Sequence, residues 1–114
     1  MTKQEFVDLL KAIKVPVSES TPQDKDMESD IRICYWDYNW EDNMASGKEY
    51  NTVVTYQVSV IASKPRHPKL LELKQKLNAS GLHPSIQHEY FPEKRRVHSF
   101  FSVDVLENIG DEND

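Results

Sequence analysis

The longest alternating segment of the chain, residues 50–63, constrains the fold more than any other. Apolar side chains recur there at every second position, whereas the reverse face is more polar; they are Val54, Tyr56, Val58, Val60 and Ala62. This period of two is typical of a β-strand that buries one face. The segment is more than twice as long as the usual strand of about 5–6 residues. We therefore expect a long-stranded sheet with other elements packed on one face.

Two segments have the apolar spacing of amphipathic helices. The first covers residues 3–13, where Thr2 and Glu5 form a capping-box pattern ahead of the apolar positions. The second begins near Pro68, carries a stripe of leucines and ends at Ser80 and Gly81. Between residues 17 and 29 the chain is polar, and we expect a loop there.

Three further strands are expected at residues 30–40, 85–91 and 95–106, with a polar linker at 41–49 and a turn at 92–94. The element order is α-β-β-α-β-β. It predicts an α+β fold with a four-stranded antiparallel sheet in the order 1-2-4-3. Both helices would pack on the face that carries Val58, Val60, Phe101 and Val103. Residues 1–107 would form a single domain, and residues 108–114 an acidic, flexible tail.

Charge and cysteine content bear on compartment and partners. The formal net charge is -5, and the only compact basic run is at residues 94–96. Phosphate binding requires a concentrated basic surface, so nucleic acid is a disfavoured partner. Cys34 is the only cysteine, which favours a reducing compartment such as the cytosol. The polar first residues do not resemble a secretory signal, and no apolar run reaches the length of a membrane span.

Residues that could carry catalysis or bind metal are scattered. His88 and His98 could share a metal ion across neighbouring strands, with Glu89 or Asp104, but their spacing differs from that of common zinc sites. Surface histidines are the favoured interpretation. Cys34 has no glycine-rich turn beside it that would activate a thiolate, so a buried structural thiol is expected. With three glycines in the chain, a phosphate-binding loop is not expected. We expect no enzyme activity, no metal and no cofactor.

An aromatic run, YWDYNW at residues 35–40, has two competing interpretations. Alternation places Trp36, Tyr38 and Trp40, together with Cys34, on the face opposite Tyr35. The run could close one side of a thin core. Alternatively it is a contact surface, since Trp and Tyr are enriched at binding hot spots. Base stacking on single-stranded nucleic acid is disfavoured by the acidic charge.

The element order and the residue pattern of the segments resemble those of the tail-terminator, or tail-completion, proteins. These proteins join head to tail in long-tailed bacteriophages and Gram-positive prophages. The likeness is carried by residues 53–64 (VVTYQVSVIASK), 68–77 (PKLLELKQKL) and 100–106 (FFSVDVL), within residues 29–107. Residues 17–29 give no cue to this family. These motifs are matches of size and order rather than signatures.

The resemblance implies a structural protein that forms a homo-oligomeric ring, commonly a hexamer. The ring would cap the tail tube and bind the major tail-tube protein and the head connector. The protein would occupy the host cytoplasm and then the head–tail junction of the virion. The expected contact residues are Trp36, Tyr38, Trp40, Asn43, Met44 and Gly47. Two alternatives stay open: a cytosolic adaptor or regulatory protein that binds one partner through residues 34–40, and a nucleic-acid-processing enzyme or binder that uses Arg95, Arg96, His88 and His98.

Overall fold

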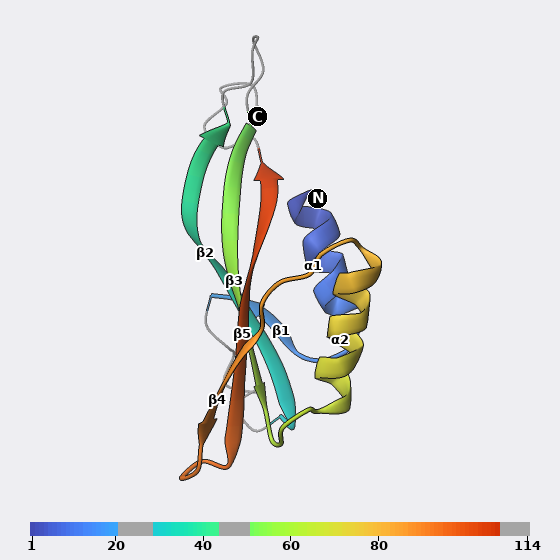
Figure 1. Cartoon of the computed structure of the whole chain (residues 1–114), viewed down its shortest axis with the longest axis vertical. Coiled ribbons are helices and arrows are strands. Elements are labelled where there is room, and N and C mark those ends of the chain that lie inside the picture. Colours follow the sequence, from blue (N-terminus) through green and yellow to red (C-terminus); the bar gives the residue numbers. More distant parts are fainter. Residues whose placement is uncertain (21–28, 44–50, 108–114) are drawn as a thin grey trace.

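The computed structural model describes residues 1–20, 29–43 and 51–107. In chain order the elements are α1 (Lys3–Lys11), β1 (Val17–Glu19), β2 (Ile31–Asn43), β3 (Asn51–Ala62), α2 (Pro68–Ala79), β4 (Gln87–Phe91) and β5 (Arg96–Glu107). The strands form one mixed sheet in the order β1-β2-β3-β5-β4, and both helices lie on the same face (Figure 1). Among the described helices, neither is long and apolar enough to cross a lipid bilayer.

The predicted four-stranded antiparallel sheet in the order 1-2-4-3 is wrong, because a fifth strand joins the sheet. β1 falls within the segment expected to be a loop, and it pairs in parallel with β2 at Ile33, Cys34 and Tyr35. Ile33 and Ser20 each donate a backbone hydrogen bond across this junction, over 2.8 Å. A three-residue strand with polar neighbours has too short a pattern for alternation to reveal it. The four longer strands pair antiparallel, β2 with β3, β3 with β5 and β4 with β5.

Local sequence explains where each helix begins and ends. Thr2 caps α1, since its hydroxyl accepts from the Glu5 amide while the Glu5 carboxylate accepts from the Thr2 amide. α1 ends at Lys11, two residues before the predicted end, and Lys14 then takes a left-handed φ of 58°. At the start of α2, His67 Nδ1 accepts from the Lys69 amide over 3.1 Å, and Pro68 occupies the first turn.

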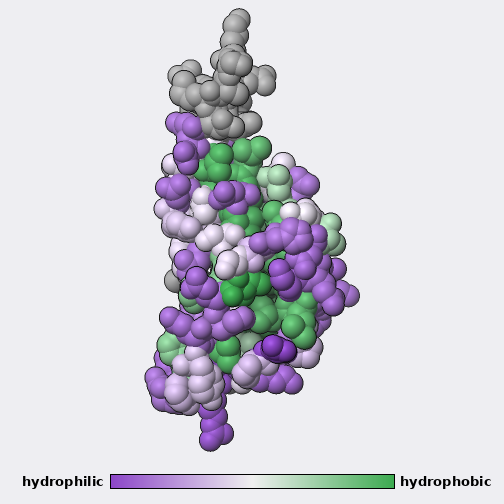
Figure 2. Space-filling model, in the orientation of Figure 1, coloured by the Kyte–Doolittle hydropathy of each residue, from purple (hydrophilic) through white to green (hydrophobic). Residues whose placement is uncertain are grey.

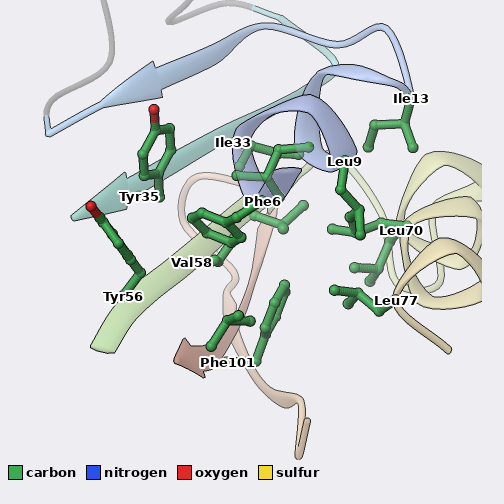
Figure 3. Close-up of a cluster of buried hydrophobic side chains, with 14 of the residues drawn as sticks. Phe6, Leu9, Ile13, Ile33, Tyr35, Tyr56, Val58, Leu70, Leu77 and Phe101 are labelled. Atoms are coloured by element: carbon green, nitrogen blue, oxygen red, sulfur yellow. The ribbon is translucent and has the colours of Figure 1, made fainter. Parts of the chain in front are cut away.

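The core lies between the helices and the sheet. The ring of Phe6 is fully buried and contacts Tyr35 and Tyr56, with ring centroids 5.6 and 5.2 Å away (Figure 3). Leu73 and Leu77 of α2 are also fully buried in this layer. A fully buried side chain of this size stabilises the fold by about 1.5–3 kcal/mol. The Tyr56 hydroxyl reaches the rim of the core, where it donates to Glu107 over 2.9 Å.

Candidate protein-interaction surface

One end of the sheet consists of β2, β3 and β5 without a flanking strand from β1 or β4. This region, which we call the arm, comprises residues 37–43, 51–56 and 102–107. β1 pairs with β2 only as far as Tyr35, and β4 pairs with β5 only as far as Phe100. In the part of the chain that the structure describes, no strand pairs with the outer edge of residues 37–43. The unpaired backbone N–H and C=O groups of such an edge can form hydrogen bonds with a strand of another chain.

A β-bulge at Tyr38 redirects the aromatic side chains of the arm. Asp37 lies opposite Tyr56, but the next pair along is Asn39 with Thr55, so Tyr38 has no partner in β3. The extra residue reverses the alternation. Trp36 lies opposite Gln57 on the face away from the helices, whereas Trp40 lies opposite Val54 on the helix-bearing face.

The predicted common face for Trp36, Tyr38 and Trp40 is therefore wrong, because alternation alone does not reveal a bulge. The Tyr38 hydroxyl lies 3.1 Å from Ser102 Oγ, which places Tyr38 on the same outer face as Trp36. Tyr38 is 57% exposed and Trp40 is 59% exposed, while Trp36 is partly buried. Asn43 is the last residue of β2, within the segment expected to be a linker. Met44 and Gly47 lie outside the described residues.

The arm is uniformly acidic. Its sequence has no lysine or arginine and five carboxylates: Asp37, Glu41, Asp42, Asp104 and Glu107. Four of them accept hydrogen bonds from neutral donors, namely Trp40 Nε1 (2.6 Å), Thr52 Oγ1 (3.0 Å), Thr55 Oγ1 (2.6 Å) and the Tyr56 hydroxyl (2.9 Å). Burial and then the bond to Glu107 raise the pKa of Tyr56, so its hydroxyl stays protonated as a donor. The arm thus presents negative charge with two exposed aromatic rings.

At the other end of the sheet, α2 and β4 border a groove of about 390 Å³ on the helix-bearing face. Its apolar lining comes from Leu70, Leu71, Pro84 and Ile86. Its polar lining comes from Arg66, Lys74 and His88, with no carboxylate among the lining residues. Figure 2 shows hydrophobic side chains beside α2 in the lower half of the view, bordered by hydrophilic ones. Sequence reasoning missed this basic groove, because its residues come from a loop, a helix and a segment about twenty positions further along the chain.

The two histidines considered as a metal pair lie on opposite faces of the sheet. His88 lies on the helix-bearing face, opposite Ser99. The Nδ1 atom of His88 is 2.7 Å from the Oγ atom of Ser99. His98 lies opposite Glu89 on the outer face, between the rings of Phe91 and Phe100. They cannot bind one ion together. Burial lowers the pKa of His98, against the opposing effect of Glu89, and its Nε2 is buried without a hydrogen-bond partner.

A serine, an aspartate and a histidine meet where β2 begins and β3 ends, but in the wrong order for nucleophilic catalysis. The Ser63 hydroxyl donates to Asp30 rather than to the imidazole. His67 Nδ1 accepts from a backbone amide, so Nε2 carries the proton and lies 2.5 Å from Asp30 Oδ2. The hydrogen bonds from Ser63 and then from His67 lower the pKa of Asp30. This cluster ties α2 to the sheet. Cys34 is buried in β2.

Comparison with known proteins places the chain in no family. No protein-family model matches it, and no curated protein sequence matches it. Among solved structures it is similar to a sheath/tube terminator of an extracellular contractile injection system, PVC, solved by cryo-EM in the extended state. The match has 14% sequence identity and a TM-score of 0.34, and it covers 98% of this chain. The chain spans 59% of the length of that terminator chain. A likeness at this TM-score does not establish a shared fold.

Proposed function

We propose that this protein is a structural assembly protein that acts at the end of a bacteriophage or prophage tail. It forms a homo-oligomeric ring, caps the tail tube and joins it to the head connector, without catalysis. It resides in the host cytoplasm before assembly and at the head–tail junction of the virion afterwards. The proposal joins the sequence resemblance over residues 29–107 to the character of the arm.

The observation that carries the proposal is the pair of exposed aromatic side chains, Tyr38 and Trp40, on opposite faces of an open-edged strand. Large aromatic residues that remain exposed on a fold with a complete core elsewhere favour contact with other chains. Because one ring lies on each face, the arm could be enclosed from both sides in an assembly. The acidic charge of the arm favours partner surfaces that are basic.

The experiment mixes the purified protein with tubes assembled from the major tail-tube protein of the same phage or prophage. Co-sedimentation and electron microscopy should show the protein bound at a tube end. The double variant Tyr38→Ala/Trp40→Ala should lose this binding. Tyr90→Ala is the matched control, because Tyr90 is 60% exposed but lies on β4, outside the arm. A folded wild-type protein that does not bind the tubes would overturn the proposal and favour the adaptor alternative.

A further inference from the structure

The groove between α2 and β4 carries cations that the described side chains do not neutralise. Lys74 Nζ donates a hydrogen bond over 3.1 Å to Asn78 Oδ1, and this amide oxygen is a neutral acceptor. No ion pair among the described residues involves Arg66. Leu71 beside them is 48% exposed. An apolar floor with a cationic rim fits an occupant that has an apolar ring flanked by carboxylates.

The arm of the same protein carries such a feature. Trp40 lies on the helix-bearing face of β2, where Asp37 and Asp42 flank it. We propose that the arm of one copy docks into the α2/β4 groove of a second copy, with Trp40 against Leu71 and Ile86 and the carboxylates beside Arg66 and Lys74. This contact deepens the proposed function, since it names the surfaces through which the copies assemble.

The two surfaces cannot meet within one chain. Trp40 lies opposite Val54, which in turn lies opposite Val105 of β5. The groove residue His88 lies opposite Ser99 of the same strand. Ser99 and Val105 are six residue steps apart along one continuous strand, or about 20 Å at 3.3 Å per residue. The contact must therefore form between copies.

The indole is fixed in place before it binds. Its Nε1 donates to Asp37 Oδ2 over 2.6 Å, which holds the ring on the helix-bearing face. A side chain that is already ordered loses less conformational freedom on docking. Trp buries about 150–250 Å² when it is enclosed, and its face can also stack on a guanidinium such as that of Arg66.

Charge also decides which pairing of copies is favoured. Arm against arm would oppose five carboxylates with five, and groove against groove would oppose two sets of cations. Arm against groove pairs opposite charges. This contact joins two different surfaces, so each copy can bind one neighbour through its arm and another through its groove. Such a contact generates a ring where the rotation closes, and an open chain where it does not.

Charge reversal tests the contact. Asp42→Lys reverses the charge beside Trp40 on the arm, and Arg66→Glu/Lys74→Glu reverses the groove. Sedimentation velocity should show that each variant alone self-associates about tenfold or more weakly than the wild type. An equal mixture of the two should regain association, because each reversed surface then meets a complementary partner. The matched control Glu93→Lys/Lys94→Glu exchanges two exposed charges at the β4–β5 turn and should associate as the wild type does.

A cysteine pair gives the geometric readout. Asp42→Cys and Lys74→Cys chains, purified separately and mixed under mild oxidation, should form a mixed disulfide dimer, because Asp42 shares the face of Trp40. Asp42→Cys mixed with Lys11→Cys on α1 should not. The inference is overturned if the wild type stays monomeric at its highest soluble concentration, if reversal leaves association unchanged, or if the folded reversed variants fail to associate when mixed. Tube binding is measured in a separate experiment. The proposed arm–groove contact can therefore be shown wrong while the tail role is confirmed, and the tail role can be shown wrong while the contact is confirmed.

Discussion

Trp40 donates a hydrogen bond from its indole to Asp37 over 2.6 Å, and both residues lie on the helix-bearing face although an odd number of positions separates them. In a regular strand they would point to opposite faces. The bulge at Tyr38 brings them together. One inserted residue therefore places Tyr38 on one face of the arm and Trp40 on the other.

Removal of the Asp37 carboxylate should release the indole without unfolding the protein. In Asp37→Ala, we expect the free energy of unfolding to fall by at most about 1 kcal/mol, because the bond is solvent-exposed. The near-UV circular dichroism of the tryptophans should weaken, and self-association should decrease. Asp104→Ala is the control, since it removes a carboxylate of the same arm that is bonded to Thr55 on the outer face. Equal effects of the two variants on self-association would contradict the role assigned to the Trp40–Asp37 bond.

Phe6 should be among the most costly residues to truncate. Its ring is fully buried against Tyr35 and Tyr56 and joins α1 to β2 and β3. Phe6→Ala should lower the free energy of unfolding by about 3–5 kcal/mol, as measured by urea denaturation. Phe100→Ala, on the outer face, should lose less than half as much, because Phe100 is only partly buried. Similar losses in the free energy of unfolding at both positions would contradict this expectation, and would mean that side chains on the outer face are buried as well.

The sequence predicts well those parts of the fold that repeat a pattern over many residues. The long alternation of β3 and the leucine stripe of α2 correspond closely to the observed elements. β1 escaped prediction because three residues held by pairing carry no period. The bulge at Tyr38 escaped for a related reason: every residue in YWDYNW suits a strand, and only the register against β3 shows which one is extra. The groove depends on tertiary packing between α2 and β4, which no local pattern encodes.

His98 should make the stability depend on pH near neutrality. Burial holds its pKa below the usual value of about 6.5, so as pH falls through that value the unfolded chain takes up a proton before the folded one. Stability is therefore fully present above about pH 6.5 and decreases below it. His98→Phe removes this titration and a buried nitrogen without a partner, and it keeps a ring between Phe91 and Phe100.

Chemical denaturation at several pH values from 7.5 to 5 would measure this effect. We expect His98→Phe to be more stable than the wild type throughout, with a difference that grows as the pH falls. The control His83→Gln changes an exposed histidine and should keep the wild-type dependence. A difference in stability that does not change with pH would show that the titration of His98 has no effect. The variant would then gain stability only because the unpaired nitrogen is removed.

The β4–β5 turn contains a residue in an unfavourable backbone conformation. Arg95 has a φ of 51°, in the left-handed region, where an L-residue pays about 1–2 kcal/mol and glycine does not. Its amide donates to the Pro92 carbonyl over 3.2 Å, which holds the turn.

Arg95→Gly should raise the free energy of unfolding by about 0.5–1 kcal/mol, because relief of this strain exceeds the entropy that glycine loses on folding. Arg96→Gly, one residue further and inside β5, should instead destabilise the protein by up to about 1 kcal/mol. Thermal unfolding followed by circular dichroism would measure both changes, and two shifts in the same direction would contradict the strain argument. Arg95 lies outside the arm and the groove, so Arg95→Gly should also self-associate as the wild type does.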